Sequence, residues 1–67
     1  MRELANRLRE LRKENGLTII HLSKEVGISK SAISQWETST TDITGDNLII
    51  LAKYFKVSTD YLLGLED

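Results

Sequence analysis

The sequence has no cysteine among its 67 residues, which excludes disulfide bonds and thiolate metal sites. It also lacks a long apolar run. The longest, Leu48 to Ala52, is too short for a membrane span or the core of a signal peptide. Because a chain of this length can hold only one small core, we expect residues 1–67 to form a single cytoplasmic domain that is stabilised by packing.

Residues suited to catalysis or metal binding are scarce. His21 is the only histidine, and neither a cysteine nor a suitable carboxylate pair accompanies it as a metal ligand. The carboxylates are scattered over polar positions and provide no convergent acid, base or nucleophile. We therefore expect no metal, no cofactor and no enzymatic activity, and we interpret His21 as a surface or capping residue.

The chain also lacks an excess of positive charge. Its formal net charge is −1, which argues weakly against a nucleic-acid partner, because basic residues normally neutralise the phosphates. The distribution is uneven, however: residues 1–36 carry seven basic and four acidic side chains, whereas residues 37–67 carry two basic and six acidic ones. This pattern predicts a molecule with a positive end and a negative end.

Apolar residues at helical spacing predict a first helix in the N-terminal segment. The leucines that recur at i, i+4 and i+7 are Leu4, Leu8 and Leu11. Asn15-Gly16 provides a left-handed end for this helix. Thr18 is the predicted N-cap of a second helix, which extends to about Glu25 and ends at Gly27.

The same signals repeat further along the chain. Ser29 is the predicted N-cap of a third helix that continues through Trp36, and Thr38 to Thr44 has no helical period and is expected to be a loop. A fourth helix has apolar residues at Leu48, Leu51, Ala52 and Phe55. A short fifth helix is expected from the Ser58 cap to Gly64. Because no segment alternates like a strand, the predicted fold class is all-α, with five short helices around one core.

Two helices of about eight residues joined by a tight glycine turn are the pattern of the DNA-binding helix-turn-helix. In the third helix Ile33 and Trp36 share the inward face, and we favour core packing over base stacking for Trp36. The outward residues, which include no carboxylate before Glu37, are Lys30, Ser31, Ser34 and Gln35. Base edges in the major groove require such donors and acceptors without negative charge. The third helix, about residues 29–36, is therefore the predicted recognition helix.

The chain resembles the lambda-repressor-like (Xre/Cro type) family of helix-turn-helix regulators. The segments that carry the resemblance are Leu8–Arg12, Gly16–Thr18, Gly27–Ser29, Ala32–Glu37, Asn47-Leu48 and Asp60–Gly64. They span nearly the whole chain, and Ala32–Glu37 together with Asp60–Gly64 looks similar to the N-terminal domains of lambdoid phage repressors. The resemblance implies a compact five-helix domain in a transcriptional regulator, with a repressor favoured. It also implies a bacterial or phage-encoded protein associated with the nucleoid.

The resemblance further implies specific roles for individual residues. The side chains implied to face base edges are Lys30, Ser31, Ser34 and Gln35. Gln35 suits adenine N6 and N7, and Lys30 suits guanine or a nearby phosphate. The residues expected at phosphates are Thr18, Ser29, Thr38 and Thr40. Arg12 and Glu37 match a family pair that forms a salt bridge between the first helix and the end of the recognition helix.

The sequence departs from the family pattern at three places. Ile19 stands where relatives commonly place a phosphate-binding Gln, and His21 stands where a Glu would complete a capping box with Thr18. The loop from Thr38 to Asp42 has hydroxyls and one carboxylate instead of basic residues. These departures predict weaker phosphate anchoring. At most one of Ile19 and Ile20 can face inward, and we favour partial burial of this pair over a protein-binding patch.

We expect the partner to be a double-stranded DNA operator with two-fold symmetry, bound by a homodimer on half-sites about one helical turn apart. The apolar residues that exceed what a short fifth helix can bury, and that would form the dimer contact, are Tyr61, Leu63 and Leu65. The alternative is a protein-interaction or antitoxin-type module with weak, sequence-independent DNA binding. The pattern fits both a complete small regulator and the first domain of a larger repressor.

Overall fold

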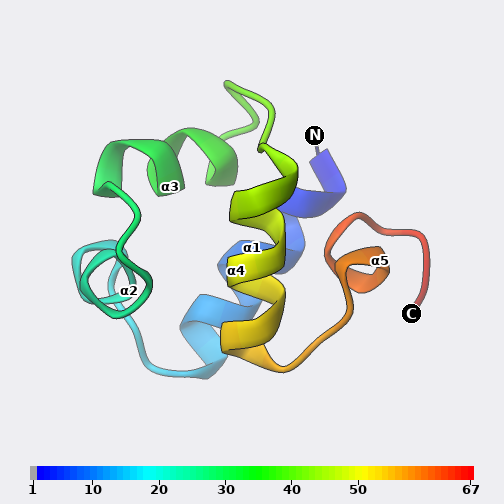
Figure 1. The fold of residues 1–67 in the computed structure, drawn as a ribbon, viewed down its shortest axis with the longest axis horizontal. Coiled ribbons are helices and arrows are strands. Elements are labelled where there is room, and N and C mark those ends of the chain that lie inside the picture. The colour runs from blue at the N-terminus through cyan, green and yellow to red at the C-terminus, as the bar shows by residue number, and fades with distance from the viewer. Residues whose placement is uncertain (1) are drawn as a thin grey trace.

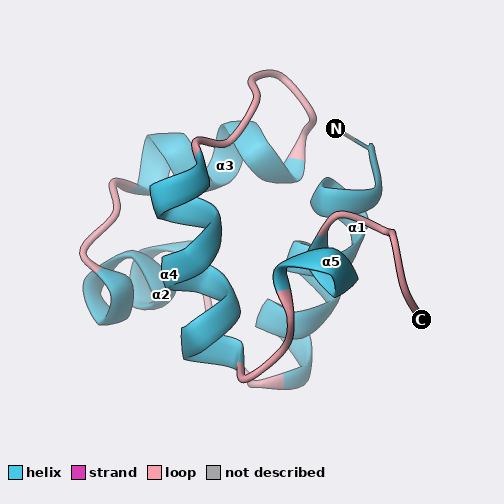
Figure 2. Ribbon diagram, turned by 45° about the vertical axis from the view of Figure 1, so that its right-hand side comes forward, coloured by secondary structure: helices cyan, strands magenta, loops and turns pink. Residues whose placement is uncertain are grey.

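The computed structural model describes residues 2–67 and contains five helices (Figure 1). In chain order they are α1 (Arg2–Glu14), α2 (Ile19–Val26), α3 (Lys30–Glu37), α4 (Gly45–Phe55) and α5 (Thr59–Leu62). Within residues 2–67 every element is a helix or a loop, as Figure 2 shows. The predicted all-α fold with five helices is therefore confirmed.

The core takes one apolar stripe from each helix. The largest fully buried side chains are Leu4, Leu8, Leu22, Ile33, Leu51 and Leu62. Helix α1 packs against both α3 and α5, whereas α4 packs against α2 and α5. The α2–α3 pair therefore lies at one end of the molecule and α5 at the other, with α1 and α4 between them (Figure 1).

Hydroxyl side chains begin four of the helices, and the sequence predicts three of these caps, Thr18, Ser29 and Ser58. The N-cap residues, each of which accepts a hydrogen bond from the backbone N–H three positions later, are Thr18, Ser29, Thr44 and Ser58. Each cap satisfies a backbone donor that has no partner inside its helix. The start of each helix after α1 is thus determined by local chemistry.

Two predicted helix ends differ from the structure. Helix α3 includes Glu37 and is capped by Thr38, one residue beyond the predicted end at Trp36. Helix α5 ends at Leu62 instead of Gly64, because the Gly64 and Leu65 N–H groups donate back to the Tyr61 and Asp60 carbonyls. Gly64 has a φ of 79°, and this left-handed turn satisfies the last carbonyls of α5.

None of the helices in the described part of the chain is both long enough and apolar enough to cross a membrane.

Candidate nucleic-acid interface

Helix α3 has two sharply different faces. Ile33 and Trp36 are buried in the core, with Trp36 only 4% exposed. The four predicted base-contacting residues, Lys30, Ser31, Ser34 and Gln35, are all exposed. The prediction that Trp36 packs in the core is confirmed, so its ring is not available for stacking on a base. The outer face offers one ammonium, two hydroxyls and one amide to a ligand.

An open groove of about 420 Å³ lies between this outer face and the beginning of α2. Its polar side is formed by Lys30, Ser31, Ser34 and Gln35, and its apolar side by Ile19 and Ile20. Ile19 is half-buried and packs against the core, whereas Ile20 is 54% exposed. The prediction that at most one of the two isoleucines faces inward is confirmed, whereas the favoured partial burial holds for Ile19 and not for Ile20. We call Ile19 and Ile20 together the isoleucine edge.

The turn between α2 and α3 determines how this groove is shaped. Gly27 adopts φ 72° and ψ 24°, and its N–H donates to the Ser23 carbonyl at the end of α2. The Ser23 hydroxyl donates to the Ile28 carbonyl, which ties α2 to the residue before the α3 cap. Ile28 is buried in the core. The short turn therefore presents α3 at a defined angle to α2.

A buried ion pair anchors the end of α3 to α1. Arg12 Nε and Glu37 Oε2 are 2.7 Å apart, and a second hydrogen bond joins Arg12 Nη2 to Glu37 Oε1 at 2.9 Å. Arg12 also donates to the Leu17 carbonyl. The hydrogen bonds to Glu37 raise the pKa of Arg12 further above its already high ordinary value, so the guanidinium stays charged. The Glu37 carboxylate is turned inward and is not part of the exposed face of α3.

The predicted phosphate-contacting residues fall into two groups. The Thr18 and Ser29 hydroxyls accept hydrogen bonds from backbone N–H groups at the starts of α2 and α3, and no acceptor within residues 2–67 takes their hydrogens. In contrast, the Thr38 hydroxyl lies 3.1 Å from the Ser34 and Gln35 carbonyls and 2.7 Å from the Thr40 hydroxyl. A phosphate at Thr38 or Thr40 would have to replace one of these bonds.

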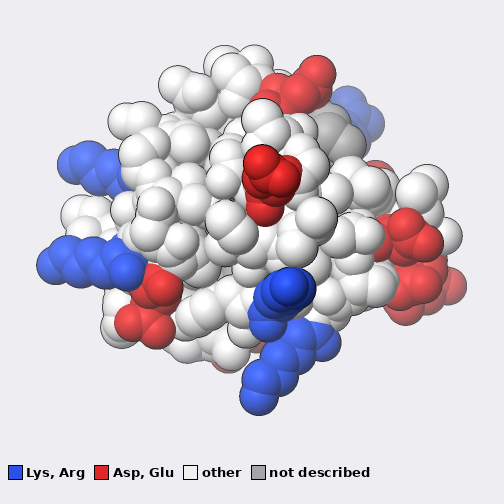
Figure 3. Space-filling view, viewed as in Figure 1, with Lys and Arg blue, Asp and Glu red and all other residues white. Residues whose placement is uncertain are grey.

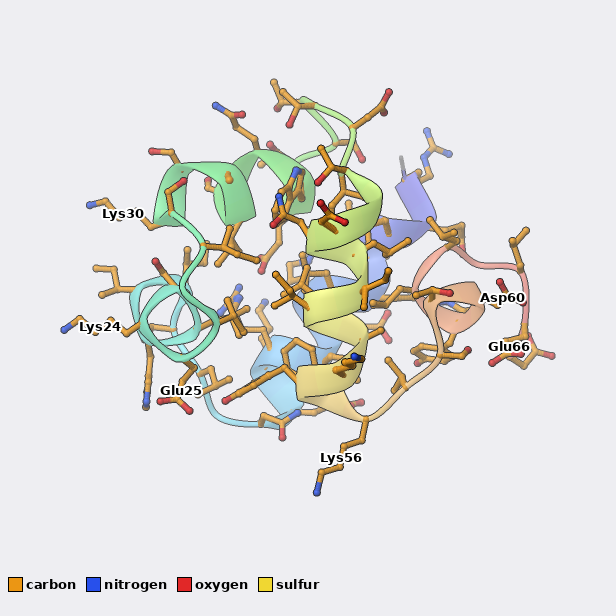
Figure 4. The ribbon with its side chains drawn as sticks, in the orientation of Figure 1. Lys24, Glu25, Lys30, Lys56, Asp60 and Glu66 are labelled. Atoms are coloured by element: carbon orange, nitrogen blue, oxygen red, sulfur yellow. The ribbon has the colours of Figure 1, made fainter. Side chains whose placement is uncertain are left out.

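On the face shown in Figure 3, basic side chains project at the left end and acidic side chains gather at the right end, with further acidic side chains at the top and centre and basic ones at the bottom and upper right. Lys24 and Lys30 project from the end formed by α2 and α3, whereas Asp60 and Glu66 lie at the α5 end (Figure 4). Glu25 lies at the same end as the lysines, where one of its oxygens accepts from the Tyr54 hydroxyl at 3.3 Å. The predicted charge asymmetry thus places basic side chains beside the groove.

Lone His21 is exposed, and its backbone N–H donates to the Thr18 cap. Within residues 2–67 no three His, Cys, Asp or Glu side chains gather closely enough to hold a metal ion.

Two arginines of α1 have structural roles that the sequence interpretation missed. Arg7 donates to the Tyr61 carbonyl at 2.9 Å, and its guanidinium lies 4.4 Å from the centre of the Tyr61 ring. Arg9 donates to the Glu37 carbonyl at 3.1 Å. Both flank the leucine stripe of α1, a position where a long side chain can reach a neighbouring helix. Their place beside the stripe was the only signal in the sequence.

Comparison with known proteins identifies the family. A helix-turn-helix family model matches residues 8–62. The HTH-type transcriptional regulator YobD of Bacillus subtilis is 44% identical over 61 residues, covering 91% of this chain and 54% of YobD. Repressor protein C2 of Salmonella phage P22 is 45% identical over 60 residues, covering 90% of this chain and 28% of the repressor. The chain thus spans about half, or less, of these relatives.

Solved structures match over nearly the whole chain. The P22 c2 repressor in complex with a synthetic operator superposes with a TM-score of 0.86 and 43% identity, covering 94% of this chain and 96% of that one. A solution structure of the P22 c2 DNA-binding domain gives a TM-score of 0.80 at 45% identity, covering 90% of this chain and 79% of that one. The resemblance to phage repressor domains is confirmed, and the chain belongs to the helix-turn-helix family.

Proposed function

We propose that this chain is the DNA-binding domain of a transcriptional repressor and that α3 lies in the major groove of a specific operator. The observation that carries the proposal is the outer face of α3, which exposes four polar residues while its only carboxylate, Glu37, is buried against Arg12. Such a face can approach DNA without repelling the phosphates. The similar P22 c2 repressor has a solved complex with a synthetic operator, which supports operator DNA as the ligand of this fold.

Each exposed side chain of α3 suits a different contact. The side-chain amide of Gln35 can donate a hydrogen bond to N7 of adenine and accept one from N6 at the same time. This pair of bonds would let Gln35 recognise adenine specifically. Lys30 is at the first position of α3 and can donate to guanine O6 and N7 or to a phosphate. The Ser31 and Ser34 hydroxyls can donate or accept at base edges. We assign base recognition to these four residues.

Phosphate contacts position the helix without recognising sequence. Thr18 and Ser29 lie at the N-termini of α2 and α3, where backbone N–H groups and the helix dipole favour an anion. We assign the main phosphate contacts to these two caps. Thr38 and Thr40 in the following loop are assigned secondary contacts, because their hydroxyls are already hydrogen-bonded to each other.

We also assign a homodimer to the functional state, formed through the C-terminal end. Tyr61 and Leu63 are half-buried, and Leu65 is 73% exposed. Pairing these apolar surfaces would place two α3 helices on half-sites about one turn of DNA apart. Sedimentation of the chain alone and on operator DNA tests this. One chain per two-fold site would contradict it.

Selection of bound sequences from random duplex DNA tests the proposed function. Wild type should enrich one two-fold sequence. Gln35→Ala should lower affinity by roughly 1–3 kcal/mol and relax the preference at one position. Lys30→Ala should do the same at another position if Lys30 contacts a base, or weaken all sequences equally if it contacts a phosphate. Lys56→Ala is the matched control, because Lys56 is the C-cap of α4 and does not line the groove. This variant should leave the enriched sequence unchanged. Identical preferences in wild type and Gln35→Ala would contradict the assignment.

A second candidate is a protein-interaction or antitoxin-type module. The observation that favours it is the loop from Thr38 to Asp42, which has no basic side chain. A salt titration separates the two functions. Specific binding to one operator should persist at moderate salt, whereas binding driven only by counterion release should weaken equally for all sequences. If the chain is a DNA-binding repressor, as we propose first, we also assign it a cytoplasmic, nucleoid-associated location.

A further inference from the structure

The isoleucine edge is an unusual wall for a groove whose other side is polar. Ile20 is 54% exposed although it carries a large apolar side chain, and Ile19 lies beside it, packed against the core. The same groove is lined by Ser31, Ser34 and Gln35. Exposed apolar surface inside a recognition site marks a position where an apolar group of the ligand is buried.

Only one base presents an apolar group in the major groove, namely thymine through its 5-methyl group. The edge cannot donate a hydrogen bond to phosphate, so its place beside α3 is chemically suited to a base methyl and not to the backbone. The charges around it agree with a DNA ligand, because Lys24 and Lys30 project on the same side of the molecule (Figure 4).

We propose that the isoleucine edge, with Ile20 as the exposed contact and Ile19 beneath it, packs on the 5-methyl group of a thymine next to the base that Gln35 recognises. The edge thereby determines specificity at one position of the half-site through an apolar contact. This inference rests on the proposed function, because it requires α3 to lie in the major groove.

Deoxyuridine, which differs from thymidine only by the missing methyl group, provides the test. The enriched operator is synthesised with each thymine replaced in turn by deoxyuridine, and binding by the full chain is titrated for each duplex. Wild type should bind about fourfold more weakly when one particular thymine of each half-site is replaced, the loss expected for one buried methyl group. Ile20→Thr keeps the β-branched shape and should bind both duplexes equally.

Ile49→Thr is the matched control, because Ile49 is 46% exposed on α4 and does not line the groove. This variant should keep the full penalty for deoxyuridine. Circular dichroism of the variants reports folding, and the wild-type titration alone tests the proposal even if Ile20→Thr fails to fold.

Three results would overturn the proposal. Wild-type binding that is insensitive to every thymine replacement removes the methyl contact. If Ile20→Thr and Ile19→Thr both still bind the deoxyuridine duplex about as weakly as wild type does, the methyl group contacts another side chain. Wild-type insensitivity to deoxyuridine, combined with loss of self-association in the Ile20→Thr variant, would identify the edge as a protein contact. The proposed function fails separately, if random DNA yields no enriched sequence at all.

Discussion

Helices α2–α3 and α4–α5 are built by the same local rules, although only the first pair forms the candidate interface. In each pair a left-handed residue ends the first helix, with φ 72° at Gly27 and 58° at Lys56. A serine cap two residues later begins the second helix in both, Ser29 for α3 and Ser58 for α5. The tight turn is therefore common to both ends of the molecule.

The second helices differ in length and charge. Helix α3 has eight residues and no acidic residue in its first turn. Helix α5 has four residues and carries Asp60 there. Helix α5 is thus half as long as α3, and the carboxylate in its first turn would repel phosphates. The comparison teaches that the turn supplies geometry, while the composition of the exposed face decides which pair can contact DNA.

Helix α1 contacts α3 through Arg12 and α5 through Arg7. We expect the loss of stability on removing these arginines to show the largest difference between the two regions. Arg12→Ala leaves the buried Glu37 carboxylate without its partner and should lower the free energy of unfolding by about 3 kcal/mol or more. Arg7→Ala removes a partly exposed contact to α5 and should cost about 1 kcal/mol. Urea unfolding measures both values.

A double variant refines this prediction. Arg12→Met combined with Glu37→Leu removes both charges and should recover most of the lost stability, because the cost comes from an unpaired buried charge. Equal losses for Arg12→Ala and Arg7→Ala would show that the two anchors are equivalent.

The two left-handed turn residues should respond in opposite directions. Gly27→Ala should destabilise by about 1 kcal/mol through its positive φ alone, because an added Cβ would meet no atom within 4 Å. Lys56→Gly should stabilise by up to about 1 kcal/mol, since a non-glycine residue is strained in this conformation. Thermal unfolding of the two variants checks the signs. A stabilising Gly27→Ala would contradict the shared role of the turns.

The serine caps separate an effect on stability from an effect on binding. Ser29→Ala and Ser58→Ala should each lower the free energy of unfolding by about 1 kcal/mol, as is typical for a lost N-cap. Only Ser29→Ala should also weaken binding to a single half-site, where no dimer contact is involved, because Ser58 lies at the opposite end of the molecule from α3. Parallel unfolding and binding titrations make the comparison. If both variants bind equally well, Ser29 does not contact phosphate.

Local signals were sufficient for most of the fold. The caps Thr18, Ser29 and Ser58 were predictable because a hydroxyl followed by a helical apolar period is a short-range pattern. The two faces of α3 were predictable for the same reason, since a period of 3.6 residues separates Ile33 and Trp36 from the polar residues. The roles of individual residues at DNA came from the family resemblance and stay predictions.

Contacts between distant segments were less accessible to sequence reasoning. Arg7 and Tyr61 are 54 residues apart, and no local pattern indicates that they meet. Sequence reasoning limited the inward-facing isoleucines to one but did not say which, because adjacent residues at the start of a helix point about 100° apart and the neighbouring helices determine the outcome. The hydrogen bond between Thr38 and Thr40 likewise depends on the path of the loop.

The amino-acid sequence alone was enough to define five helices, their caps and a polar outer face on α3, because these properties depend on spacing and on side chains within a few residues. The packing of α1 against both α3 and α5 arises only in the folded chain. So do the burial of Glu37 and the groove that joins Ile20 to Ser31 and Gln35. Those features require segments far apart in the sequence to exclude water together, and only tertiary structure can bring them into contact.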